Sequence, residues 1–221
     1  MPIPKRRMTG WPRTFLACAA LVVLGACVPP DLGAGLRGGR ASPQITLTDG
    51  LVLSAPRGYC VDPASTRQSP EGAFVLFGNC AAIARDPGQP QPIFPALLSA
   101  TLGPAGARPK VLDTAEVEGF FRSDAGRAVL ARSGRAEDVE LLEVEHEGDL
   151  LLLKIRDASG GGEGLQMGAS YWRAITGLGD RLAALSVLPL EGARIADRDQ
   201  IALLQGFAAQ TRAVRAAQTG G

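Results

Sequence analysis

The sequence predicts an α+β fold: a mostly antiparallel sheet, two helices packed on one face of it, and one disulfide. Apolar segments of strand length follow one another across short turns, which is typical of β-hairpins. Two other segments carry apolar residues at helical spacing, one in the middle of the chain and one near its end. Apolar residues make up 46% of the 221 residues, which is enough to bury a core.

The first part of the domain is predicted to be strands. Asp49-Gly50 is a strong hairpin signal between two apolar segments. Asp86–Pro95 contains four prolines and is predicted to be an extended loop. The apolar segments that predict strands on either side of these turns are Ile45–Leu47, Leu51–Leu53, Ala73–Phe77 and Ala96–Leu102.

A helix is predicted to begin after Leu112. Asp113 can cap it and Glu116 completes a capping box, while Leu112 can pack against Val117 as a hydrophobic staple. Gly126 weakens the middle of this helix. Its expected apolar face consists of Val117, Phe120, Phe121, Ala128 and Ala131.

Two hairpins and a last helix follow. Asp197, with Gln200 three residues later, is expected to cap this helix. The two hairpins are Val139–His146 with Leu150–Ile155, and Gln166–Thr176 with Arg181–Leu188. The apolar stripe of the helix is Ile201, Leu204, Ala208, Thr211 and Val214. We expect a single globular domain over residues 44–215 and a disordered tail at 216–221.

The N-terminus has the features of an export signal. Lys5, Arg6, Arg7 and Arg13 precede an apolar run of twelve residues, Phe15–Ala26, which is too short to span a membrane. The run ends in Leu24-Gly25-Ala26-Cys27, which resembles the lipobox of bacterial lipoproteins. An ordinary secretory signal whose cleavage site lies beside a cysteine is the alternative.

The resemblance to bacterial lipoproteins implies that residues 1–26 are removed and that Cys27 is acylated. The chain would then be anchored to a membrane by its acyl chains rather than span it. Val28 after the cysteine implies sorting to the outer membrane of a Gram-negative envelope, facing the periplasm. Residues 27–43, rich in glycine and proline, are expected to form a flexible tether.

Export would also place the remaining cysteines in an oxidising compartment. Cys18 would be lost with the signal peptide and Cys27 acylated, which leaves Cys60 and Cys80 to pair. Closing the loop of nineteen residues between them would stabilise the fold by about 3 kcal/mol. We therefore expect a structural disulfide rather than a reactive thiol pair, because the C-x-x-C spacing is absent from the sequence.

The element order resembles that of the PsbP-like α+β fold over residues 44–215. Strands are followed by a helix, two hairpins and a second helix. This resemblance implies an adaptor or accessory role. It lies in the order and length of the elements, so it transfers no functional residue.

Several classes of chemistry are not expected. A net charge of +1 is too balanced for a nucleic-acid-binding protein. The sequence has no G-x-S-x-G elbow, H-E-x-x-H motif or P-loop, and its composition does not favour a metal or cofactor site. The single histidine, His146, is expected to be an exposed residue near a hairpin end, pointing to the opposite face from Glu145 and Glu147.

The sequence also contains a pair of adjacent aromatic residues and an acidic segment. Tyr171 and Trp172 are expected to point to opposite faces of a strand, one into the core and one outward. The acidic residues between Glu137 and Asp149 are expected to be solvated.

The sequence thus predicts a non-enzymatic, lipid-anchored envelope protein that binds or assists another envelope component. A periplasmic carrier of a small molecule or lipid, with a pocket between the sheet and its helices, is the alternative. A hydrolase ranks third. A carrier needs an apolar cavity of a few hundred Å³, whereas an adaptor needs an exposed apolar patch.

Overall fold

The computed structural model describes residues 41–107, 113–159, 168 and 170–219, with side chains as far as Arg212. Contacts divide the chain into Met1–Arg37 and Gly38–Gly221, and every described residue belongs to the second unit. The predicted signal peptide, the acylation site Cys27 and the tether up to residue 40 lie outside the described residues.

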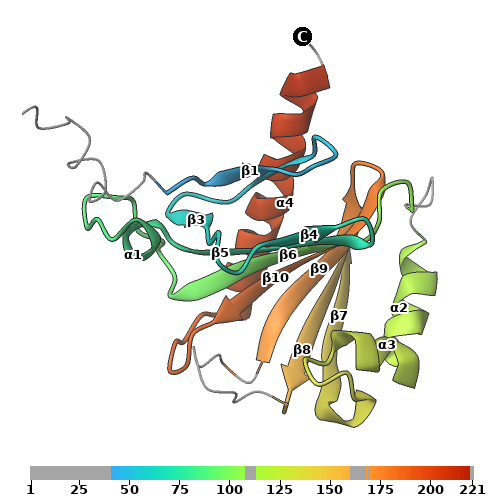
Figure 1. Cartoon of the computed structure of the whole chain (residues 1–221). Coiled ribbons are helices and arrows are strands. Elements are labelled where there is room, and N and C mark those ends of the chain that lie inside the picture. The colour runs from blue at the N-terminus through green and yellow to red at the C-terminus, as the bar shows by residue number, and fades with distance from the viewer. Residues whose placement is uncertain (1–40, 108–112, 160–167, 169, 220–221) are drawn as a thin grey trace, which may run out of the picture. The chain divides into compact units, whose positions relative to one another are not determined.

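The centre of the domain is an antiparallel sheet with the spatial order β3-β5-β6-β10-β9-β8-β7 (Figure 1). The short strand β4 also pairs with β5, and β1 and β2 form a separate two-stranded hairpin. The strands are β1 (Gln44–Thr46), β2 (Val52–Ser54), β3 (Tyr59–Val61), β4 (Arg67–Ser69), β5 (Gly72–Asn79), β6 (Ala96–Leu102), β7 (Val139–Glu147), β8 (Leu150–Asp157), β9 (Ser170–Leu178) and β10 (Arg181–Pro189). The predicted mostly antiparallel sheet is confirmed.

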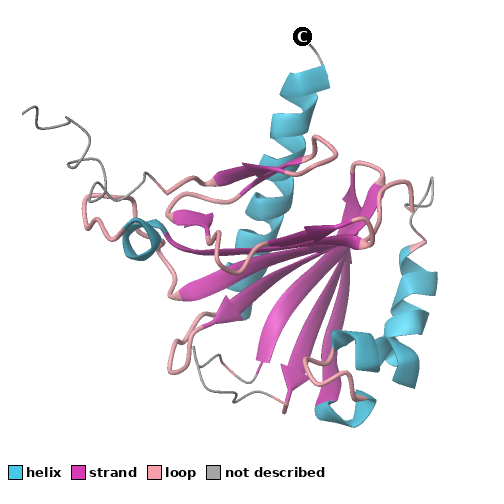
Figure 2. Cartoon of the chain, viewed as in Figure 1, coloured by secondary structure: helices cyan, strands magenta, loops and turns pink. Residues whose placement is uncertain are grey.

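The helices lie on both sides of this sheet (Figure 2). They are α1 (Cys80–Ala84), α2 (Thr114–Arg122), α3 (Asp124–Leu130) and α4 (Asp197–Thr219). Helix α4 extends beyond residue 215, where the domain was expected to end. None of the described helices combines the length and the apolar character needed to cross a membrane.

The core has two layers because β8 is apolar on both faces. Leu150 and Leu152 pack with Leu204 and Phe207 of α4 and with the β1–β2 hairpin. The alternate residues Leu151, Leu153 and Ile155 pack with Phe121 of α2 and Leu130 of α3. The expected packing of both helices on one face is therefore not confirmed. A strand with apolar residues on both faces, as at Leu150–Leu153 here, needs cover on both sides.

The predicted middle helix is broken into α2 and α3 at Ser123. The Asp113 cap is confirmed, because its Oδ1 accepts hydrogen bonds from the N–H groups of Ala115 and Glu116. Ser123 then caps α3, its Oγ accepting from the N–H of Gly126 at 3.2 Å. A Cβ on Gly126 would lie 2.0 Å from the carbonyl oxygen of Phe120, so a glycine is needed where the helices meet.

Candidate functional site: an apolar pocket beside the disulfide

The predicted disulfide is present and joins β3 to the start of α1. Cys60 and Cys80 are both buried, and their Cα atoms are 4.8 Å apart. Asn79 accepts a hydrogen bond from the Ala81 N–H through its Oδ1 and so caps α1. The disulfide and this cap fix a short helix against the end of β5.

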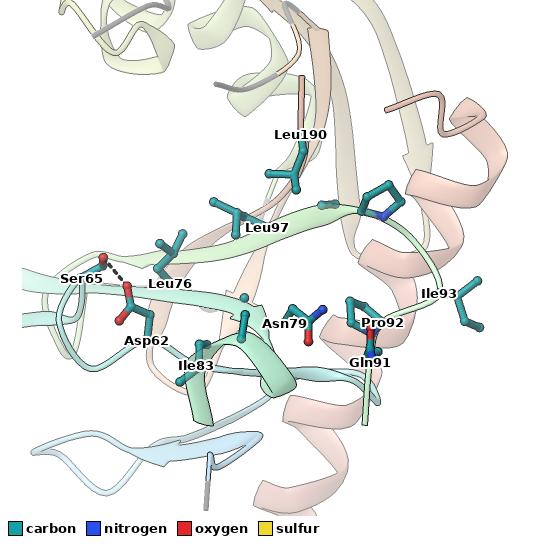
Figure 3. A pocket seen from close by; sticks show the side chains of 14 residues that line it. Asp62, Ser65, Leu76, Asn79, Ile83, Gln91, Pro92, Ile93, Leu97 and Leu190 are labelled. Carbon is teal, nitrogen blue, oxygen red and sulfur yellow. Dashed lines mark hydrogen bonds between the residues drawn. The ribbon is translucent and has the colours of Figure 1, made fainter. Parts of the chain in front are cut away.

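A pocket of about 650 Å³ opens next to α1, over β5 and β6 (Figure 3). Phe77 and Leu98 point from these strands into the core layer that holds α4. Leu76 and Leu97 alternate with them and line the pocket from the other face. Helices α2 and α3 cover this same face, but over β7 and β8. The pocket thus occupies the other end of this face, with β10 and β9 between.

The pocket wall is mostly apolar, with a few polar side chains. The apolar lining includes Leu76, Ile83, Pro92, Ile93, Leu97 and Leu190. Asp62 and Ser65 lie near one end, and the Ser65 hydroxyl donates to Asp62 Oδ2 at 2.5 Å (Figure 3). Asn79 and Gln91 also line the pocket, and only the Oδ1 of Asn79 is used by the α1 cap. This volume and lining are typical of a site for a small, largely apolar ligand.

The proline-rich loop, residues 86–95, is held in place as a wall of the pocket. Gly58 lies so close to it that a Cβ there would be 2.4 Å from the carbonyl carbon of Gln91, and its φ of +92° favours glycine. The hydroxyl of Tyr59 donates to the Phe94 carbonyl oxygen at 2.9 Å. Burial raises the pKa of Tyr59 to about 12, so this donor keeps its proton.

Sequence reasoning did not find this pocket. The loop was predicted, but the carrier alternative placed a pocket between the sheet and its two predicted helices, where the structure has packed side chains. The available signal was a loop with four prolines between two apolar strands, directly after a disulfide cysteine. The four prolines lack an N–H group and so cannot donate to a strand ladder, which favours a loop outside the sheet.

His146 has hydrogen-bonding partners that the sequence did not predict. Its side chain is 43% exposed near the β7 hairpin end and lies against α2. Its Nδ1 is 3.1 Å from Thr114 Oγ1, and its Nε2 is 2.7 Å from Glu118 Oε2. Glu147 instead contacts Gln205 of α4, so neighbouring residues do point to opposite faces, as predicted.

Thr114, His146 and Glu118 form a hydrogen-bonded chain of hydroxyl, imidazole and carboxylate, which is the arrangement a hydrolase uses to activate a nucleophile. The surroundings of Thr114 do not suit that role. The next two backbone N–H groups already donate to Asp113, so they are not free to stabilise an oxyanion. The hydrogen bond from His146, and then that from Arg122, hold the pKa of Glu118 below its ordinary value. The trio therefore fastens α2 to strand β7.

The acidic segment is largely paired. Most of it forms β7, the last strand in the order of the sheet, and most of its acids contact cations or amides. The contacts are Glu137 and Asp138 with Arg135, Glu140 with Arg156, Glu143 with Lys154, Glu147 with Gln205 and Asp149 with Arg212. Charged residues on an edge strand oppose pairing with another chain. The described residues contain no group of three or more acids, histidines or cysteines placed to hold a metal ion.

Tyr171 and Trp172 are both buried, so the expectation that one points outward was wrong. Tyr171 lies in the layer with α2 and α3, where the guanidinium carbons of Arg132 and Arg173 are 5.9 and 5.4 Å from its ring centre. Trp172 lies in the layer with α4, and its Nε1 donates to Asp197 Oδ1 at 2.9 Å. Both faces of β9 are covered, which leaves no exposed ring here.

No protein-family model, curated protein or solved structure matches this chain.

Proposed function

We propose that this chain is a lipid-anchored, non-enzymatic binding protein of the bacterial envelope that holds a small apolar ligand in the pocket beside the Cys60–Cys80 disulfide. The 650 Å³ pocket with its apolar lining carries the proposal, because ligand sites of about 300–1,000 Å³ are typically lined in this way. Attachment through Cys27 would place the domain on the periplasmic side of the outer membrane.

The disulfide supports an exported location. Such bonds persist in oxidising compartments and are rare where thiols are kept reduced. The buried pair Cys60 and Cys80 lacks C-x-x-C spacing and braces the wall of the pocket, which fits a structural role. This argument is independent of the lipobox and favours the same compartment.

A pocket favours ligand binding over a purely accessory role. A tethered domain would hold its ligand at the membrane surface rather than carry it across the periplasm. Docking of a protein partner is the second candidate. It is favoured by Phe120 on α2 and Val129 on α3, which are 46% and 68% exposed. Isolated exposed apolar residues are common on protein surfaces, so this observation is the weaker of the two.

The test is titration of residues 38–221 with N-phenyl-1-naphthylamine, an uncharged apolar dye that fluoresces when it leaves water. We expect saturable binding with one site per chain. Ala82→Phe adds a ring to an exposed pocket residue of α1 and should weaken binding by roughly tenfold, which corresponds to about 1.4 kcal/mol.

Ala202→Phe adds the same ring to an exposed residue of α4 and should leave the affinity for the dye unchanged. Equal affinity of both variants and the unaltered chain would contradict the proposal, since the dye would then bind elsewhere. Circular dichroism of each variant checks that the fold is retained.

A further inference from the structure

The start of the described chain lies beside the pocket. The carbonyl oxygen of Ser42 accepts a hydrogen bond from the N–H of Val61 at 2.8 Å. The next residue, Asp62, lines the pocket and donates its own N–H to the carbonyl of Leu76. The segment that leads back to Cys27 therefore joins the domain within one residue of the pocket wall.

The length of this segment limits how far the pocket can be from the anchor. Fourteen residues lie between Cys27 and Ser42, and a chain of that length reaches at most about 50 Å when fully extended. An acyl anchor at Cys27 would thus hold Ser42 within that distance of the membrane surface.

The pocket is lined by one strongly exposed apolar residue, and two exposed cations are close in the chain to residues of its wall. Ile93 is 89% exposed on the proline-rich loop, at the edge of the pocket (Figure 3). Arg57 precedes Gly58, which packs on Gln91, and Arg85 follows α1. Both arginines are exposed, and neither forms an ion pair with an acid in the described part of the chain.

This combination fits a phospholipid better than a soluble ligand. An apolar side chain and basic residues together are what a protein surface presents to an anionic membrane. Leu76, Ile83 and Leu97 offer an apolar wall to an acyl chain. Arg57 and Arg85, which are close in the chain to residues of this wall, offer exposed cations for a phosphate.

Building on the proposed function, we propose that the pocket takes one acyl chain of an anionic phospholipid from the membrane to which the chain is anchored. The phosphate group would lie at the rim, near Arg57 and Arg85. Ile93 would enter the interfacial region of the bilayer.

The test uses the full-length protein, purified with its anchor and placed in phosphatidylethanolamine vesicles. These vesicles contain a phosphatidylglycerol that carries a photoreactive diazirine on one acyl chain. After irradiation, mass spectrometry of the digested protein should find the label on peptides that contain Leu76, Ile83 or Leu97. Ala82→Phe should reduce this labelling roughly tenfold, and Ala202→Phe should not change it.

The headgroup contact is tested in the same vesicles. Arg57→Gln and Arg85→Gln should each lower pocket labelling by roughly fivefold, the effect expected for one basic residue near an anionic surface. Arg198→Gln changes an exposed arginine of α4 and should have no effect. Replacing the photoreactive phosphatidylglycerol by the corresponding phosphatidylcholine should lower labelling as much as removing both arginines.

A wild-type pocket that stays unlabelled, or labelling unaffected by Ala82→Phe, would overturn the inference. If the protein's own acyl chain filled the pocket, the pocket would stay unlabelled, because only the added lipid carries the diazirine. That result would also overturn the inference. Dye binding to residues 38–221 separates the two proposals. Bound dye with an unlabelled pocket removes the phospholipid but keeps the binding site, and loss of both removes the site itself.

Discussion

At the scale of single residues, Asp197 shows how tertiary contacts can override a local signal. The sequence predicts it as the cap of α4, but the Ala196 carbonyl accepts the first helical hydrogen bonds, from Asp199 and Gln200. The Asp197 carboxylate instead accepts from the buried Trp172 indole and from Lys154 Nζ at 2.8 Å. These contacts, led by that with Lys154, hold the pKa of Asp197 below its ordinary value.

Asp197→Ala should therefore destabilise the domain by about 1–3 kcal/mol, because it leaves a buried indole N–H without an acceptor. Asp199→Ala removes a more weakly paired acid two residues further along α4 and should change the free energy of unfolding little. Chemical denaturation of both variants measures the difference. Equal stability of the two would show that the hydrogen bond to Trp172 contributes nothing.

The same contact predicts a pH dependence. A carboxylate with a lowered pKa stabilises the folded state above the pKa it has when unfolded, about 3.9 for aspartate. This stabilisation is lost as the pH falls through the lower folded value. Residues 38–221 contain one tryptophan, Trp172, so the fluorescence of this part of the chain reports the step directly. We expect Asp197→Ala to remove the acid transition, and an unchanged transition would contradict the assignment.

At the scale of elements, the junction of α2 and α3 depends on Gly126. Gly126→Ala should destabilise the domain by about 1–3 kcal/mol, because its Cβ would overlap the Phe120 carbonyl. Gly119→Ala, in the exposed part of α2 with no atom within 4 Å, should stabilise by up to about 1 kcal/mol. Thermal unfolding followed by circular dichroism measures both. A shift in the same direction for the pair would contradict this account of the junction.

Turn residues made the hairpins predictable, whereas the faces covered by the helices were not. Asp49-Gly50 and the turn at Gly148 specify local geometry, and the strands on either side of them pair as expected. The same local patterns do not state which side of a sheet a helix covers. Leu150–Ile155 contains the missing information, because a strand without alternation needs cover on both faces.

The candidate site was predictable only in part, for a similar reason. Cys60 and Cys80 could be paired by elimination, given export. The pocket depends on how residues 86–95 fold back over β5 and β6, and its lining comes from several separate segments. Short strands such as β3 and β4 exist because they pair with β5, so their three residues carry little signal of their own.

At the scale of the whole molecule, the disulfide links the stability of the domain to the pocket. Replacing Cys60 and Cys80 by serine should lower the free energy of unfolding by about 3 kcal/mol, from the loop that the bond closes. The same change should weaken dye binding, because α1 forms one wall of the pocket. Undiminished stability together with full dye affinity would contradict a structural role for this bond.

The central claim is that the domain contains a disulfide and is attached to a membrane by a lipid anchor. The most direct test is the intact, non-reduced mass of the protein purified from its native membrane fraction. We predict a chain that begins at Cys27, carries the mass of a glyceryl group and its acyl chains, and lacks two hydrogen atoms because Cys60 and Cys80 are bonded. A mass without lipid would contradict the anchor and, with it, the placement of the pocket at a membrane surface.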